Sequence, residues 1–363
     1  MHQETLLGRP ISDVDTPALL LDLGAAERNI ARMADFFADK PCKVRPHTKT
    51  HKLPMLAHAQ IKAGAIGVTC AKVEEAGLFI DHGISSVLIA NQIVGITKIR
   101  RLLELQERAD VIVCIDSLQN AQALSNAAAE VGKHISFLIE IDVGLHRCGV
   151  APLKPAVDFL QQITRFGHLR FRGINGYEGS LFSEDPAETQ KLCRESNALF
   201  VETRALIERA GFEVEICSAG SSNTYDLSGS YPGITDVQPG AYVTMDACNA
   251  HYGVPFEQAV TILATVTSRP APDRAITDAG KRSLTSDLGL PICTAEGIEL
   301  RALNDEHGIL GIASPENPLQ IGEKISFIPT HGCTTIPCFD EYILTRNGIV
   351  EGRTPIIARA ATR

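Results

Sequence analysis

The chain has 363 residues, a formal net charge of −9 and a hydrophobic fraction of 44%. These values are typical of a well-packed globule of about two domains. The acidic balance argues against nucleic-acid or membrane-surface binding, and no apolar run approaches the roughly 20 residues of a membrane helix. Met1-His2-Gln3-Glu4 does not begin a signal peptide, so we expect a cytoplasmic protein whose ten cysteines are reduced.

Short β-rich apolar runs alternate with amphipathic stretches from residue 18 to about 243. We predict nine strands there, at 18–22, 43–48, 66–70, 86–91, 110–115, 135–142, 171–177, 214–218 and 237–243. Helical periodicity is clearest in 24–39, 153–164 and 187–210. Strands separated by helices indicate parallel βαβ units, about eight of which close a (β/α)8 TIM-like barrel. One strand is in surplus, so we expect a terminal strand to belong elsewhere.

The pattern changes after residue 255 to that of antiparallel β-structure. Residues 260–266 alternate apolar and polar side chains, and 324–328 form a second apolar run. Asn347-Gly348 is typical of a tight hairpin turn between 342–346 and 349–350. We therefore predict an α/β barrel followed by a smaller antiparallel β domain.

A cationic stretch, VRPHTKTHK at 44–52, overlaps the end of the second predicted strand. Functional groups collect at such strand ends in parallel barrels. Lys49 is either a solvated charge or an amine whose pKa is lowered by cationic neighbours, as a Schiff-base lysine requires. His47 and His51 are four residues apart, but the prolines around them argue against a helical metal pair. We expect these histidines to be solvated or to support other residues.

Three later strand ends also carry polar residues. Arg147 suits a phenolate or phosphate, or else pairs at the rim with Asp142 or Glu140. Tyr177 is equally a pocket wall or a packed ring. The stretch 218–224 (SAGSSNT) offers small residues and hydroxyls to an anion, although an ordinary polar loop has the same composition.

A histidine and a cysteine stand two residues apart in the predicted β domain. On extended backbone His331 and Cys333 would point to the same side, and imidazole with thiolate favours zinc. Such a pair alone is often accidental. Asp305-Glu306-His307-Gly308 is a second polar cluster, for which a hairpin or interface role is equally plausible.

Taken together, these residues resemble the D-threonine aldolase and D-serine dehydratase family, whose members use pyridoxal 5′-phosphate (PLP). The likeness rests on DTPALLLDL at 15–23, RPHTKTHK at 45–52, CAKVEEA at 70–76, EIDVGLHRCGV at 140–150, GYEGS at 176–180, QPGAYVTMD at 238–246, TDAGKRS at 277–283, NDEHG at 304–308 and THGCTT at 330–335. It implies an alanine racemase-like (fold type III) PLP-binding barrel over 24–250. The β domain would then be formed by 1–23 and 251–363, which removes strand 18–22 from the barrel.

The resemblance also implies roles for individual residues. Lys49 would hold PLP covalently and act in catalysis, Arg147 would approach the phenolic oxygen and Tyr177 would border the ring. The phosphate would be held by Gly220, Ser221, Ser222 and Tyr242. His331 and Cys333 would bind a divalent metal beside the substrate's β-hydroxyl; the cysteine favours zinc over manganese or magnesium. We expect a homodimer, as is common in the family, and a small D-β-hydroxy amino acid as substrate.

The reaction is harder to assign, because the sequence departs from both branches of the family. RCGV, GYEGS and QPGAYVTMD look like the aldolase side, which cleaves D-threonine-type substrates to glycine and an aldehyde. His331-Gly-Cys333-Thr-Thr looks like the dehydratase side, which releases a keto acid and ammonia from D-serine or D-3-hydroxyaspartate. We place the aldolase first. An amino-acid racemase would need a second base and no metal, and a non-catalytic PLP carrier would lack the β domain.

Overall fold

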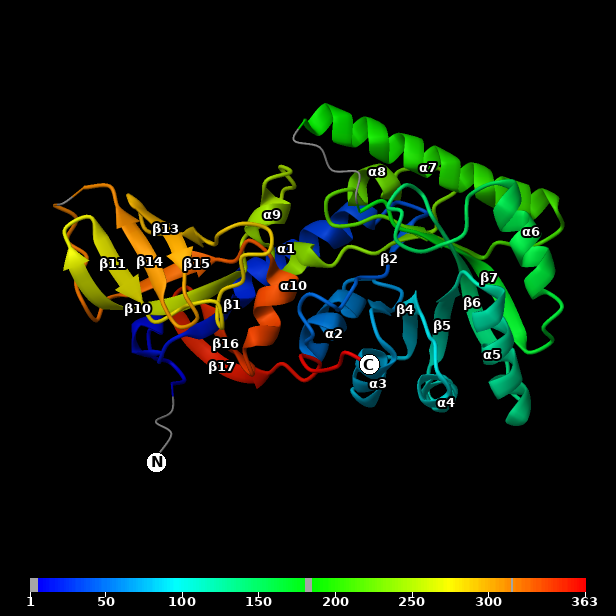
Figure 1. Ribbon diagram of the computed structural model, residues 1–363, viewed down its shortest axis with the longest axis horizontal. Helices are drawn as coiled ribbons and strands as arrows, with labels where there is room; N and C mark the ends of the chain where they lie inside the picture. Colours follow the sequence, from blue (N-terminus) through cyan, green and yellow to red (C-terminus); the bar gives the residue numbers. More distant parts are fainter. Residues whose placement is uncertain (1–5, 180–184, 315) are drawn as a thin grey trace. The chain divides into compact units, whose positions relative to one another are not determined.

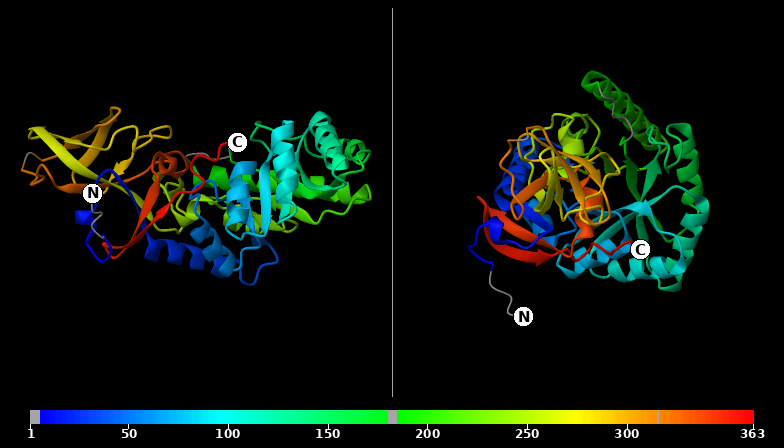
Figure 2. Two further views of the ribbon diagram at one scale, coloured as in Figure 1. Left: turned by 90° about the horizontal axis from the view of Figure 1, so that it is seen from below. Right: turned by 60° about the vertical axis from the view of Figure 1, so that its left-hand side comes forward.

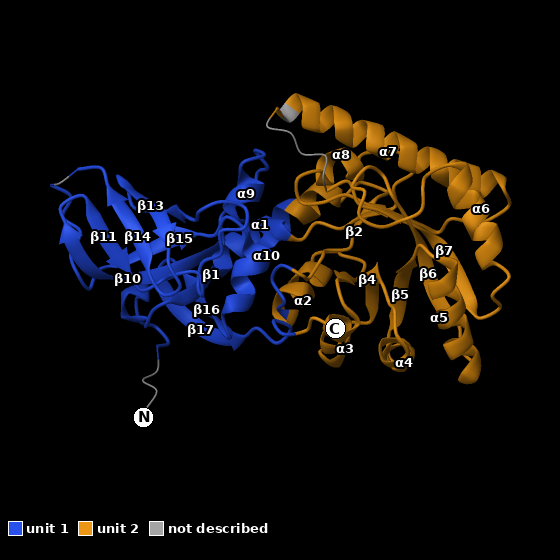
Figure 3. Cartoon of the chain, viewed as in Figure 1, with its two compact units in different colours: residues 1–32, 50–53, 241–360 blue, residues 33–49, 54–240, 361–363 orange. Residues whose placement is uncertain are grey.

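The computed structural model describes residues 6–179, 185–314 and 316–363. The chain forms two compact units, which Figure 3 distinguishes. Unit 1 consists of Met1–Arg32, Thr50–Leu53 and Ala241–Ala360, and unit 2 of Met33–Lys49, Pro54–Gly240 and Ala361–Arg363. Helix α1 (Leu23–Phe37) runs from the first unit into the second. Within the described ranges, no helix combines the length and apolarity that a membrane crossing requires.

Unit 2 is built on eight parallel strands in the order β2-β9-β8-β7-β6-β5-β4-β3. The strands are β2 (Lys43–Val44), β3 (Val68–Cys70), β4 (Ser86–Gln92), β5 (Asp110–Ile115), β6 (Ile135–Ile141), β7 (Leu169–Gly176), β8 (Ile216–Ala219) and β9 (Asp236–Val237). The helices between them are α2 (Pro54–Lys62), α3 (Val73–Asp81), α4 (Ile96–Leu105), α5 (Leu118–Glu130), α6 (Lys154–Ile163), α7 (Pro186–Arg209) and α8 (Tyr225–Gly229). Figures 1 and 2 show α3 to α7 on the outside of the curled sheet.

The sheet closes on itself between β2 and β3. Beyond β2, the backbone of His47 forms a parallel bridge with Thr69, and the Thr48 N–H donates to the Thr69 carbonyl at 2.8 Å. Pro46 has no N–H and interrupts this ladder, so the predicted strand 43–48 is regular only over its first two residues. The predicted alanine racemase-like barrel is confirmed.

The interior of the barrel is filled from several strands. Leu88, Ile112, Cys114, Leu138 and Ile216 form one buried cluster contributed by β4, β5, β6 and β8. Side chains two apart on a strand share a face, so the face that carries Leu138 also carries the next position but one, residue 140. The end of β6 therefore turns a carboxyl side chain toward the barrel interior.

One predicted strand of the barrel is largely wrong. Residues 237–243 are assigned to a strand only at β9, and Ala241–Val243 form a 3-10 turn. Pro239 cannot donate to a strand ladder, and Gly240 follows it, so the sequence favours a turn directly after β9. The predicted helices 24–39, 153–164 and 187–210 are confirmed as α1, α6 and α7 to within two residues at each end.

Unit 1 carries a nine-stranded sheet whose main path is β13-β14-β11-β10-β1-β16-β17, with β15 pairing β10 and β12. Its strands are β1 (Ala18–Asp22), β10 (Val260–Ala271), β11 (Arg274–Thr277), β12 (Ile292–Cys293), β13 (Ile298–Leu303), β14 (Gly308–Ile312), β15 (Lys324–Ile328), β16 (Glu341–Arg346) and β17 (Ile349–Pro355). Two short helices, α9 (Ala247–Ala250) and α10 (Gly332–Thr335), complete it together with 3-10 turns at Ile11–Asp13 and Ile336–Cys338. The surplus strand 18–22 is β1 of this sheet, as expected.

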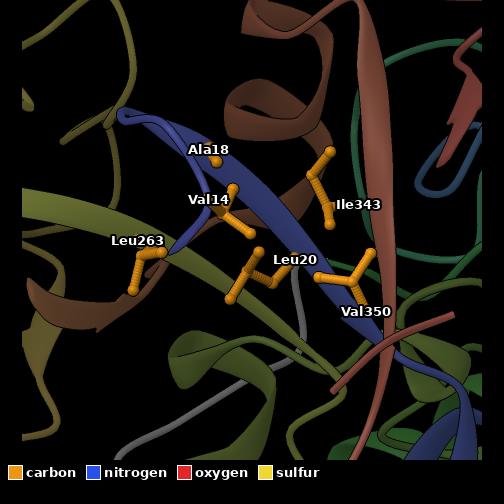
Figure 4. Packing of buried hydrophobic residues seen from close by; sticks show 6 residues of the cluster. All are labelled: Val14, Ala18, Leu20, Leu263, Ile343 and Val350. Carbon is orange, nitrogen blue, oxygen red and sulfur yellow. The ribbon is translucent and has the colours of Figure 1, made fainter. Parts of the chain in front are cut away.

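The predicted hairpin is the β16–β17 pair. Asn347 and Gly348 have φ values of 50° and 76°, the positive values that the tightest hairpin turns require. Figure 4 shows one core of this unit, where Val14, Ala18, Leu20, Leu263, Ile343 and Val350 converge from β1, β10, β16 and β17 and from the segment before β1. Each is at most 8% exposed, so β1 is fixed by packing on both of its neighbours.

Candidate active site

Lys49 lies just beyond the point where the barrel closes. The preceding residue, Thr48, is fully buried and its hydroxyl donates to the Thr69 carbonyl at 3.1 Å. The Lys49 N–H donates to Nδ1 of His47 at 3.3 Å. These bonds fix the backbone, while the half-buried side chain carries its Nζ to 5.6 Å from the centre of the Tyr177 ring. The predicted Schiff-base lysine therefore faces an aromatic side chain.

Tyr177 follows β7 and is flanked by a second cation. The Arg147 guanidinium carbon also lies 5.6 Å from the ring centre. Asp142, offered as a rim partner for this arginine, instead accepts from the backbone of Gly144 and His146 and from the His146 ring at 3.0 Å. An added Cβ at Gly179 would collide with the Tyr177 ring, so the ring position depends on a glycine two residues later. The structure brings Lys49, Arg147 and Tyr177 together.

A row of buried polar residues crosses the barrel below this cluster. Glu140, Asn175, Ser218 and Asp236 are register partners on β6, β7, β8 and β9. Asn175 donates to Glu140 at 2.6 Å, and Ser218 donates to Asp236 at 2.6 Å. The Gln238 amide joins the two halves, donating to Asn175 at 2.6 Å and to Ser218 at 2.8 Å. Barrel layers are usually filled by branched apolar residues, so this polar row is atypical and points to a site above it.

Glu140 ends the row near Arg147. Burial raises the pKa of its carboxyl group from 4.5 to about 7, while hydrogen bonds from Asn175 and Cys114 and the charge of Arg147 oppose the shift. Glu140 therefore titrates near neutral pH, where the carboxyl groups of most proteins are fully charged.

The predicted phosphate residues occupy a loop after β8. Gly220 has a φ of +78°, and an added Cβ there would come within 2.9 Å of Val237. Ser221 and Thr224 form a turn in which the Ser221 N–H donates to the Thr224 hydroxyl at 2.9 Å. The Ser222 hydroxyl accepts from the Gly240 N–H at 3.1 Å. Three of the four residues thus lie in one loop of unit 2.

Tyr242, the fourth of these residues, belongs to unit 1. Its side chain is 1% exposed, and its ring meets that of Phe256 edge-on with the centres 5.4 Å apart.

The residues of unit 2 fit the chemistry of PLP. An amine suits its aldehyde, an aromatic side chain its ring and a guanidinium its phenolic oxygen. The loop supplies backbone N–H groups, hydroxyls and a left-handed glycine, which are the elements of an anion site. Their assignment to individual atoms of the cofactor stays a prediction.

The predicted metal pair lies in unit 1 at the start of α10. The expected extended backbone is found only at His331, since Cys333 is in the short helix. The two side chains are nonetheless hydrogen-bonded to each other, which is the main cause that raises the pKa of His331 to about 9. The His331 Nδ1 lies 2.5 Å from an Asp287 carboxylate oxygen, and the Cys333 sulfur lies 3.1 Å from the Thr50 hydroxyl. Asp287 was not identified from the sequence, because it stands 44 residues before its partner.

The side chains of His331 and Cys333 are suitable metal ligands in type, but two ligands are fewer than a protein metal site usually has. A metal-bound histidine usually donates its other ring N–H to a carboxylate, and Asp287 occupies that position. In the described part of the chain, however, no group of three or more histidine, cysteine, aspartate or glutamate side chains is placed to hold an ion. Two protein ligands would leave at least two positions of a zinc ion for water or substrate.

The two histidines of the cationic stretch are buried, so the expectation that they are solvated is wrong. His47 and His51 are 9% and 0% exposed. Each ring Nδ1 accepts a backbone N–H two residues later, from Lys49 at 3.3 Å and from Leu53 at 3.0 Å. They support the backbone around the lysine, which was the alternative.

Comparison with known proteins identifies the family of the chain. The model of the alanine racemase N-terminal domain matches residues 21–248, and that of a putative serine dehydratase domain matches 259–345. The D-threonine aldolase of Arthrobacter sp is 33% identical over 98% of this chain and 96% of its own length. The chain belongs to the D-threonine aldolase and D-serine dehydratase family. It is accordingly a PLP-dependent lyase with the fold expected from its motifs.

Solved structures of an aldolase and of a dehydratase both resemble this chain over almost its whole length. The crystal structure of D-threonine aldolase from Filomicrobium marinum is 37% identical, with a TM-score of 0.95 over 98% of this chain and 99% of its own. D-threo-3-hydroxyaspartate dehydratase from Delftia sp. HT23 is 30% identical, with a TM-score of 0.88 over 95% and 98%. Two further solved structures are of D-threo-3-hydroxyaspartate dehydratase variants, one in a metal-free form with a cysteine replaced by alanine and one with a histidine, two positions earlier, replaced by alanine.

Proposed function

We propose that the protein is a PLP- and divalent-metal-dependent lyase that cleaves D-3-hydroxy amino acids of the D-threonine type into glycine and an aldehyde. The observation that carries the proposal is the cluster at the barrel mouth, where Lys49 and Arg147 flank Tyr177 at equal distances of 5.6 Å. The likeness to aldolase structures supports retro-aldol cleavage as the first candidate. We also infer that the enzyme works as a homodimer on small substrates.

The residues of unit 2 would divide the work of binding the cofactor. PLP supplies an electron sink for negative charge that develops at the substrate's Cα. Lys49 supplies the amine that binds its aldehyde, and Tyr177 holds the ring in position. Arg147 offers donors to the phenolic oxygen, and Gly220, Ser221 and Ser222 offer theirs to the phosphate. We assign Tyr242 to the same phosphate group on the resemblance of its motif.

The residues of unit 1 would hold the metal. His331 and Cys333 supply a nitrogen and a thiolate ligand, and Asp287 fixes the orientation of the imidazole ring. A divalent ion held there would act as a Lewis acid on the substrate's β-hydroxyl group. We propose zinc, because a thiolate ligand disfavours manganese and magnesium.

A dehydratase is the second candidate, and Cys333 favours it. The histidine and cysteine replaced in the solved D-threo-3-hydroxyaspartate dehydratase variants have the spacing of His331 and Cys333, and the cysteine variant was solved in a metal-free form. Zinc with a thiolate ligand suits the departure of hydroxide, the bond broken in a dehydration. The substrate would then be D-serine or D-3-hydroxyaspartate.

Product analysis separates the two reactions. The purified protein, supplied with PLP and zinc, is incubated with D-threonine, D-serine and, as a control, L-threonine. We expect equal amounts of glycine and acetaldehyde from D-threonine and no turnover of L-threonine. Ammonia with an equal amount of keto acid would establish the dehydratase instead. If D-threonine is converted only into another stereoisomer of threonine, with neither glycine and acetaldehyde nor ammonia and keto acid, both lyase reactions are rejected and a racemase is indicated.

A further inference from the structure

Glu178 is a buried acid that the proposed function leaves without a role. It directly follows Tyr177 and is 1% exposed. One carboxyl oxygen, Oε2, accepts the Gly220 N–H at 3.2 Å, and the other, Oε1, accepts from the Thr224 hydroxyl. The Glu178 side chain is thus hydrogen-bonded to both ends of the loop 220–224, which is the candidate phosphate site.

The same bonds fix the residues between those two ends. The Thr224 hydroxyl accepts the Ser221 N–H at 2.9 Å and lies 3.1 Å from the Ser221 hydroxyl. The Ser221 hydroxyl in turn accepts the Asn223 N–H at 3.3 Å. Without the carboxyl group, the Gly220 N–H and the Thr224 hydroxyl would each lose a buried hydrogen-bond partner. The turn that orients the N–H and hydroxyl donors of the loop would then be less well fixed.

A negative charge beneath an anion site would oppose binding unless it is neutralised. Burial raises the pKa of Glu178 above 4.5, and a bound phosphate dianion would raise it further. The neutral acid can donate its own proton to the Thr224 oxygen while still accepting the Gly220 N–H. The Thr224 hydroxyl proton then becomes available to the anion. Hydrogen bonds from Thr224, Gly220 and Ser228 oppose this rise in pKa, and the Cys193 thiol of α7 also faces the carboxyl group.

We propose that Glu178 is a positioning residue for the phosphate group of the cofactor, acting by tying Gly220 to Thr224. The inference rests on the proposed use of PLP. It concerns the phosphate alone, so pyridoxal, which has the same aldehyde but no phosphate, provides an internal reference.

The test is a comparison of two dissociation constants for each variant. The full-length protein freed of cofactor is titrated with PLP and with pyridoxal, and binding is followed by the absorbance of the cofactor. Loss of two hydrogen bonds in Glu178→Ala should weaken PLP binding about 30-fold and pyridoxal binding less than about threefold. Glu178→Gln accepts and donates like the neutral acid and should retain the wild-type preference for PLP. Glu195→Ala, which removes an exposed carboxylate from α7, is the matched control.

Thr224→Val provides a second route to the same loss if the alanine variant does not fold. It keeps the shape of the side chain and removes the hydroxyl, so it too should lower only the affinity for PLP. The proposed role of Glu178 would be overturned if the variants bound PLP and pyridoxal equally more weakly, or if the alanine and valine variants kept the wild-type affinity for PLP. It would also be overturned if Glu178→Gln bound PLP as weakly as Glu178→Ala. Failure of the wild-type protein to bind PLP, or binding unaffected by Lys49→Ala, would instead reject the proposed function.

Discussion

Both residues of the candidate metal pair, His331 and Cys333, have further partners in unit 1. Nδ1 of His331 is taken by Asp287 at 2.5 Å, and Cys333 lies 3.1 Å from the Thr50 hydroxyl. The Gly332 N–H between them donates to Asp246 at 2.8 Å, which fixes the turn that brings them together. Such supporting bonds orient ligands before an ion arrives.

Replacement of these residues should therefore change metal content in a graded way. We expect Cys333→Ser to lose bound zinc, because it removes a thiolate ligand. Asp287→Asn should weaken zinc binding about 10–100-fold, because it disturbs only the orientation of the imidazole. Bound zinc is measured by elemental mass spectrometry after dialysis. Cys338→Ser, which changes an exposed cysteine five residues away, is the control. Wild-type zinc content in Cys333→Ser would remove this residue from the site.

Sequence motifs could identify residues whose neighbours lie close along the chain. Lys49 within its cationic stretch and the pair at 331 and 333 were proposed as site residues in this way. Glu178 and Asp287 carry no such signal, because their partners Gly220 and His331 stand 42 and 44 residues away. Only folding brings these partners together, so their roles emerged from the structure.

At the scale of elements, the polar row across β6 to β9 distinguishes this barrel from an ordinary one. Each strand contributes one member at a matching register position. Strand positions were largely predictable from apolar runs, but register between strands was not, because it depends on the shear of the closed barrel. The row therefore could not be seen in the sequence, although Glu140 itself was noted as a partner for Arg147.

Glu140 makes the stability of the protein depend on pH. Its folded-state pKa of about 7 lies above the usual value of 4.5, so folding favours the protonated form. The associated stability is fully present below about pH 4.5 and is lost as the pH rises through about 7, a change on the order of 3 kcal/mol. Urea unfolding between about pH 5 and pH 8 should show this decline in the wild type and a flatter profile in Glu140→Gln.

Exposed Glu130→Gln on α5 is the control and should keep the wild-type profile. The same slope in Glu140→Gln as in the wild type would mean that groups other than Glu140 account for the pH dependence.

At the scale of the whole molecule, unit 1 is assembled from both ends of the sequence. β1 lies between β10, with which it is antiparallel, and β16, with which it is parallel. The surplus of one strand indicated this arrangement, and the family resemblance assigned it to the first strand. The order of the remaining strands was not predictable, because hydrophobic alternation is the same in an edge strand and a central one.

The central place of β1 should make unit 1 sensitive to its apolar side chains. Leu20 is 4% exposed within the core shown in Figure 4, and Leu20→Ala should cost about 2–5 kcal/mol. Hydrogen exchange followed by mass spectrometry should then accelerate in peptides from β10 and β16 by about 30-fold or more. Leu7→Ala, at a position 64% exposed, should leave exchange unchanged. Equal exchange in both variants would contradict a central β1.

The central claim is that Lys49, at the mouth of the barrel, holds the cofactor. It is tested most directly by reducing the PLP-loaded protein with borohydride, digesting it and locating the added mass by tandem mass spectrometry. We expect the label on Lys49 alone, with Lys52→Ala labelled like the wild type and Lys49→Ala unlabelled. A label on another lysine of the wild type, or undiminished labelling of Lys49→Ala, would contradict the account.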